Sequence, residues 1–138
     1  MTLNSFFKTA FITLTLVSGL AAQAECIPAE PVCKAMNKMA NGMDCLQHKL
    51  PPGMCYPGNL IQNALDIQQG AKDARVALLN RSSFTDEQKV EINQLFDQMD
   101  VQTQLLVTNF DDQALRDQAL KSISAIRKKG HMDFQDQN

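Results

Sequence analysis

The sequence contains little that could stack on a sugar or a base. It has no tryptophan and one tyrosine, Tyr56, and aromatic residues make up only 6% of its 138 residues. A carbohydrate or nucleic-acid platform would have to be built from phenylalanines alone. Positive charge is not in excess either, because 13 Lys and Arg face 15 Asp and Glu, a formal net charge of −2. The composition therefore argues against a nucleic-acid-binding protein.

Groups that could carry catalysis are equally scarce. The only histidines are His48 and His131, and neither lies in a recognisable serine or cysteine motif in which it could activate a nucleophile. The sequence has no glycine-rich phosphate loop, and its cysteine spacings match neither a zinc ribbon nor a c-type haem signature. We therefore expect a protein that is not an enzyme and holds no cofactor.

The chain also lacks a long hydrophobic run. The longest, residues 10–20, is shorter than the roughly 20 residues that a membrane-spanning helix needs. It follows one lysine and precedes Ala22-Gln23-Ala24, the pattern of a cleaved signal peptide. We expect cleavage after Ala24, export to the periplasm or the medium, and no membrane anchor. The remainder then forms a single helical domain, residues 25–130, followed by a flexible tail, residues 131–138.

All four cysteines lie close together in the sequence, at Cys26, Cys33, Cys45 and Cys55. In an oxidising compartment they most simply form two disulfides, for which three pairings exist. Cys33 and Cys45 lie on one predicted helix, about 18 Å apart, so they cannot bond to each other. We prefer Cys26–Cys33 with Cys45–Cys55, which closes two short loops. The crossed pairing of Cys26 with Cys45 and of Cys33 with Cys55 stays open.

Apolar residues recur with helical spacing along the rest of the chain. The pattern predicts a first helix at about 31–48, which Pro51-Pro52-Gly53 ends, and a second from an N-cap at Asn59 to about Asn80. The expected buried stripes are Val32, Met36, Met39, Met43 and Leu46 on the first helix, and Leu60, Ile61, Ala64, Leu65, Ala71, Leu78 and Leu79 on the second.

Two further helices follow. Residues 84–88, Phe-Thr-Asp-Glu-Gln, form a capping box that opens a third helix, which ends near Thr108. Asn109 or Asp111 can cap a fourth, which a basic last turn and Gly130 should stop. The expected stripes are Ile92, Leu95, Phe96, Met99 and Leu106 on the third helix, and Leu115, Ala119, Ile123 and Ile126 on the fourth. The fold class is therefore all-α: a small bundle of about four helices with a disulfide-stapled N-terminal region.

Methionines near the first helix allow an alternative interpretation. Thioether and imidazole groups are ligands for Cu(I), and the side chains that could supply them here are Met36, Met39, Met43, His48 and Met54. The simpler interpretation is that the methionines of the helix form its buried stripe, because methionine fills irregular gaps in a core.

Residues 84–126 resemble the Spy/CpxP-type periplasmic stress chaperones. That family has an L-T-x-x-Q box that opens a long helix, and residues 84–88 match it with phenylalanine in place of leucine. Residues 109–119, Asn-Phe-Asp-Asp-Gln-Ala-Leu-Arg-Asp-Gln-Ala, are similar to the family's second segment, in which a helix begins after a phenylalanine-acidic turn. The resemblance implies a non-catalytic chaperone of the bacterial periplasm.

The second and third predicted helices carry more apolar residues than one narrow stripe needs, a surplus that is typical of a partner, dimer or client surface. We therefore expect a protein that binds other proteins or unfolded clients, with a homodimer as a further option. The candidate binding residues are Phe84, Leu95, Phe96 and Met99. Two alternatives remain: a dedicated interaction subunit of a secreted or envelope complex, and a copper-binding protein.

Overall fold

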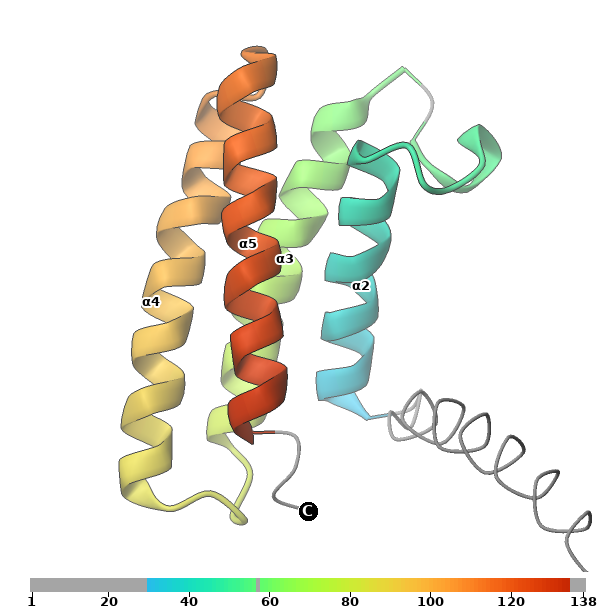
Figure 1. Ribbon diagram of the computed structural model, residues 1–138. Helices are drawn as coiled ribbons and strands as arrows, with labels where there is room; N and C mark the ends of the chain where they lie inside the picture. The colour runs from blue at the N-terminus through green and yellow to red at the C-terminus, as the bar shows by residue number, and fades with distance from the viewer. Residues whose placement is uncertain (1–29, 57, 135–138) are drawn as a thin grey trace, which may run out of the picture. The chain divides into compact units, whose positions relative to one another are not determined.

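Four α-helices make up most of the chain in the computed structural model, which describes residues 30–56 and 58–134 (Figure 1). They are α2 (Pro31–Leu46), α3 (Leu60–Leu79), α4 (Asp86–Thr108) and α5 (Gln113–Phe134), and a short 3-10 turn, η1 (Pro52–Met54), lies between the first two. All belong to one compact unit, Pro31–Asn138. The predicted all-α bundle is confirmed. None of the helices in the described part is long and apolar enough to cross a bilayer.

The helices pack in chain order. Broad interfaces join α2 to α3, α3 to α4 and α4 to α5, as expected for helices connected by short loops. α2 and α5 share no interface of comparable extent, although both face the viewer in Figure 1. The bundle is therefore closed along three sides and open between its first and last helices.

Glycine allows α2 and α3 to approach closely. A methyl group added to Gly42 of α2 would lie 2.7 Å from both the carbonyl oxygen of Asn63 and a side-chain carbon of Ile67. One added to Gly70 of α3 would lie 2.7 Å from Cγ of Met39 and 2.9 Å from the carbonyl oxygen of Ala35. Two helices this close leave little room for side chains between them.

This close packing corrects the stripe expected on α3. Its buried residues are mostly small, and the leucines and isoleucine of its first turns are left exposed on the outside. The buried set is Asn63, Ala64, Ile67, Gly70, Ala71 and Ala74, and the exposed set is Leu60, Ile61 and Leu65. On α2 the expected stripe is largely right, with Met39, Met43 and Leu46 in the core.

Polar contacts fix α3 against α4. The guanidinium of Arg75 donates from Nε to Asn93 at 3.0 Å, from Nη2 to Asp97 at 2.8 Å and from Nη1 to Asp100 at 3.1 Å. The three acceptors lie on one face of α4, because they are spaced by four and three residues. The planar guanidinium can reach all of them from one position, which favours arginine over lysine.

The capping prediction at Thr85 is confirmed. The Thr85 hydroxyl accepts from the Gln88 N–H at 3.2 Å, and the Gln88 side chain accepts from the Thr85 N–H at 2.9 Å. The cap expected for the fourth helix at Asn109 or Asp111 is wrong, because Asp112 accepts from the Leu115 N–H at 3.1 Å. Asn109 instead donates to the carbonyl oxygen of Leu105, at the end of α4.

The stop expected at Gly130 is also wrong, since α5 continues to Phe134. Tertiary contacts hold this last turn: the Phe134 ring packs edge to face on Phe84, with ring centroids 6.2 Å apart. Gly130 lies close to α4, because a methyl group there would lie 2.9 Å from the terminal side-chain carbon of Leu95. Residues 131–134 of the expected tail are thus helical, and residues 135–138 lie outside the described residues.

Candidate functional site

The disulfide prediction is confirmed for one pair. Cys45 and Cys55 are bonded, with their Cα atoms 5.6 Å apart, so the crossed pairing is excluded. Cys33 is disulfide-bonded as well, and its predicted partner Cys26 lies outside the described residues. The Cys45–Cys55 bond ties the end of α2 to the loop that leads to α3.

The residues predicted to bind other proteins lie inside the bundle. Phe84, Phe96 and Met99 are buried in the core, and Leu95 is half-buried against α5 at Gly130. Leu95, Phe96 and Met99 pack α4 against its neighbours, and Phe84, which precedes α4, packs on Phe134 of α5. The four residues do not form an exposed binding surface, because the helical period of α4 turns the apolar face with the last three towards α3 and α5.

Burial divides the candidate copper ligands. Met39 and Met43 are buried in the core and Met36 packs against it, whereas Met54 is 69% exposed and His48 is exposed. The methionines of α2 thus occupy the packing positions that the simpler interpretation assigned to them. Within residues 30–56 and 58–134, no group of three or more His, Cys, Asp or Glu side chains is arranged to hold a metal ion.

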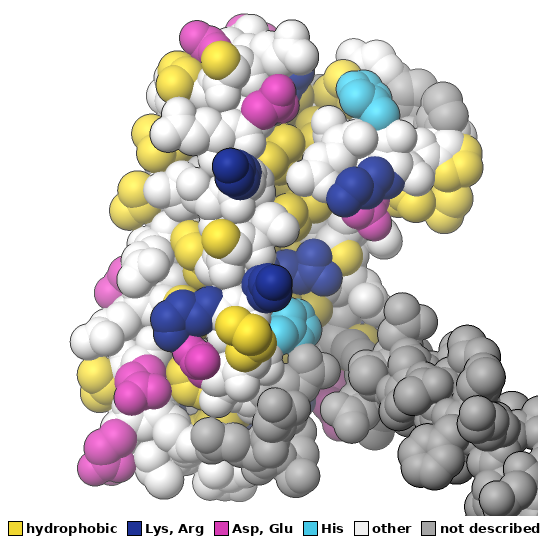
Figure 2. Space-filling view, viewed as in Figure 1, with side chains coloured by type: hydrophobic (Ala, Val, Ile, Leu, Met, Phe, Trp, Pro, Cys, Tyr) yellow, Lys and Arg dark blue, Asp and Glu magenta, His cyan; other side chains and the backbone are white. Residues whose placement is uncertain are grey.

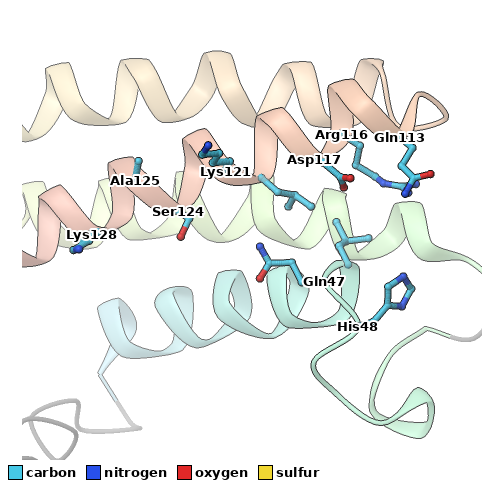
Figure 3. Close-up of a pocket in the computed structure, with 11 residues that line it drawn as sticks. Gln47, His48, Gln113, Arg116, Asp117, Lys121, Ser124, Ala125 and Lys128 are labelled. Atoms are coloured by element: carbon cyan, nitrogen blue, oxygen red, sulfur yellow. The ribbon is translucent and has the colours of Figure 1, made fainter.

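A groove of about 630 Å³ lies on the open side of the bundle, between the end of α2 and α5 (Figures 2 and 3). We call it the α2–α5 groove. Leu46 and Leu120 are 7% and 2% exposed and lie at its floor. Figure 2 shows hydrophobic side chains in the depth of this hollow and Lys and Arg side chains beside it. The other lining residues are Gln47, His48, Gln113, Arg116, Asp117, Lys121, Ser124, Ala125 and Lys128.

The charge of the groove is opposite in sign to that of the chain. Its lining contains three cations, Arg116, Lys121 and Lys128, against one anion, Asp117, whereas the full sequence has a net charge of −2. Arg116 is held in place by Phe110: its guanidinium lies 5.2 Å from the ring centroid and donates to the Phe110 carbonyl oxygen at 3.2 Å. A cation that is already positioned loses little freedom when an anion binds to it.

His48 forms the α2 end of the groove and has an uncommon backbone conformation, with φ of 56°. The N–H of Lys49 donates to the carbonyl oxygen of Asp44 at 2.8 Å, and the N–H of His48 donates to the carbonyl oxygen of Cys45 at 3.2 Å. These two bonds form the Schellman motif of a helix C-terminus. Glycine is the usual residue at the left-handed position of this motif, because a side chain there is strained. Histidine is thus present at a position where the backbone favours glycine.

A smaller hollow of about 440 Å³ lies beside His48 and is lined by both cysteines of the Cys45–Cys55 bond and by Tyr56. The carboxylate of Asp66 lies near the Tyr56 hydroxyl and raises its pKa above the ordinary value of 10.0, mainly by charge repulsion of the phenolate and also by hydrogen bonding to the phenol. This hollow adds no cation of its own to the α2–α5 groove.

One feature of the sequence indicates the α2–α5 groove, the spacing of two lysines on the fourth helix. Lys121 and Lys128 are seven residues apart, so they lie on the same face of the fourth helix, next to the buried Leu120. His48 carried no signal at all, because its left-handed conformation depends on how α2 ends. Comparison with protein-family models, with curated proteins and with solved structures finds no match to this chain.

Proposed function

We propose that this protein is exported and binds other proteins in the α2–α5 groove without catalysing a reaction. The observation that carries the proposal is the open side of the bundle, where α2 and α5 share no broad interface and a groove with a leucine floor remains. Buried apolar residues at the bottom of a groove are the usual anchor point for a partner. Export is supported by the leader-like sequence of residues 1–24.

Two versions of this function differ in their partners. A chaperone of the periplasmic stress type, as the resemblance of residues 84–126 implies, binds many unfolded clients. A dedicated subunit of an envelope complex binds one partner. The purified protein should therefore be tested for suppression of the aggregation of unrelated unfolding proteins. Suppression supports the chaperone version, and its absence at stoichiometric excess rejects that version.

A groove-filling variant connects either activity to this surface. Ala125 lines the groove and is exposed, so Ala125→Trp should block the groove without disturbing the core. Ala114 is also an exposed alanine of α5 but does not line the groove, so Ala114→Trp is the matched control. Binding that is lost in the first variant and kept in the second supports the proposal. Equal binding by both variants would reject the groove as the binding site.

A further inference from the structure

We infer that the occupant of the α2–α5 groove is an acidic amphipathic helix of a partner protein, which lies along α5 and completes the open side of the bundle. This inference rests on the proposed function and adds the chemistry and the shape of the partner.

The charges of the groove select an acidic partner. Arg116, Lys121 and Lys128 give its lining a formal charge of +3, and Asp117 reduces this to +2. Within residues 30–56 and 58–134, neither Lys121 nor Lys128 forms a salt bridge. Their ammonium groups therefore remain available to carboxylates of a bound protein. Complementary charge of this kind speeds association and excludes partners of the same sign.

The length of the groove suits a helix. Its lining on α5 runs from Gln113 to Lys128, which is fifteen helical steps or about 22 Å, room for about four turns of a second helix. Lys121 and Lys128 are seven residues apart, so about 10 Å separates them along the axis. Acidic residues seven positions apart on a partner helix have the same separation and can face both lysines, as charged pairs do at the edges of coiled coils.

A helical partner also satisfies the hydrogen bonds of its own backbone. An extended peptide needs the edge of a sheet or comparable backbone partners to satisfy its N–H and C=O groups, and the described part of the chain contains only helices and turns. A helix satisfies these groups internally. Leu46 and Leu120 then meet a narrow apolar stripe on the partner, and its acidic residues flank that stripe.

Three labelled peptides of about 18 residues test the inference. All share one apolar stripe and a helix-stabilising crosslink, and their polar positions carry glutamate, glutamine or lysine. Fluorescence anisotropy with the full protein should show that the glutamate peptide binds about tenfold more tightly than the glutamine peptide. The lysine peptide should not bind. Raising the salt concentration should weaken the glutamate peptide most, because exposed charges are screened.

Charge reversal on α5 should change the preference of the groove from the glutamate peptide to the lysine peptide. Lys121→Glu with Lys128→Glu should weaken the glutamate peptide about tenfold and allow the lysine peptide to bind. Both positions are exposed, so the fold should persist, which circular dichroism and thermal unfolding will verify. The control is Lys34→Glu with Lys72→Glu, two exposed lysines outside the groove that give the same change in net charge. The control should bind the glutamate peptide as the wild type does.

The outcomes separate this inference from the proposed function. Equal binding of all three peptides, lost in Ala125→Trp, would overturn the acidic partner and leave the groove as a protein-binding site. Binding of none of the peptides would overturn the inference. A dimer in sedimentation experiments that the double charge reversal dissociates would overturn it in favour of a second copy of the chain. The proposed function itself fails only when Ala125→Trp matches the wild type in the client and partner assays.

Discussion

The backbone of Gly42 in α2 lies directly against the backbone of Asn63 in α3: a methyl group on Gly42 would come within 2.7 Å of the Asn63 carbonyl oxygen. Gly70 has the reciprocal position on α3, against the backbone of Ala35. The neighbouring atoms include backbone atoms of packed helices, which cannot move aside cheaply.

Gly42→Ala and Gly70→Ala should each lower the free energy of unfolding by about 1–3 kcal/mol, because overpacking outweighs the gain in helix propensity of about 1 kcal/mol. Chemical denaturation followed by circular dichroism measures the change. Gly53→Ala is the control, since nothing lies within 4 Å of a methyl group at that exposed position. A Gly42→Ala protein as stable as the control would show that the two helices can separate without cost.

The guanidinium of Arg75 should contribute to stability through its hydrogen bonds to three acceptors on α4. Arg75→Met keeps the packing of the stem and removes the bonds, so we expect a loss of about 1 kcal/mol, modest because the Asp97 and Asp100 side chains are 67% and 43% exposed. The loss should shrink in high salt. Lys72→Met, at an exposed position of the same helix, should change stability by less than about 0.5 kcal/mol. Equal effects of the two substitutions on the free energy of unfolding would contradict a specific role for the Arg75 guanidinium.

Relief of backbone strain should appear at His48. His48→Gly removes the side chain from a left-handed position, and His48→Ala keeps the strained Cβ. The glycine variant should be about 1 kcal/mol more stable than the alanine variant in denaturant unfolding. If the alanine variant proved equally stable, the helix end would have to adopt another conformation in solution.

The single tyrosine makes the Asp66 contact measurable. Ultraviolet absorbance of the tyrosinate should give a midpoint above pH 10 for Tyr56 in the folded protein, because the Asp66 carboxylate raises its pKa. Asp66→Asn should lower that midpoint towards the ordinary value. Asp73→Asn, at an exposed position of the same helix, should leave it unchanged.

The same contact gives a sign for the pH dependence of stability. The folded state holds the Tyr56 proton more tightly than the unfolded chain does. The contribution of this proton to the free energy of unfolding is therefore fully present below the unfolded pKa of about 10. It is lost as the pH rises through the folded-state pKa. Stability that rose with pH over this interval would contradict the assignment, provided that the Asp66→Asn variant does not show the same rise.

The sequence by itself determined the helical class, the approximate bounds of the helices and the preferred Cys45–Cys55 pairing. These features depend on local chemistry: apolar spacing, prolines, the capping box at Thr85 and the distance along one helix that keeps Cys33 from Cys45. The stop at Gly130 failed for the opposite reason. The ring of Phe134 packs on Phe84, a residue distant in the sequence, and this tertiary contact outweighs the local preference for ending the helix.

Only the tertiary structure decided which apolar residues face a partner helix and which face solvent. The apolar side chains of Phe84, Phe96 and Met99 are typical of a binding surface, but they are buried within the bundle. Leu60 and Leu65, in contrast, stay exposed, because α2 approaches α3 over glycine and alanine. The α2–α5 groove depends on the same geometry. The groove exists because α2 and α5 are not packed together. The packing of helices far apart in sequence depends on the fit of their surfaces, and no local sequence pattern encodes that fit.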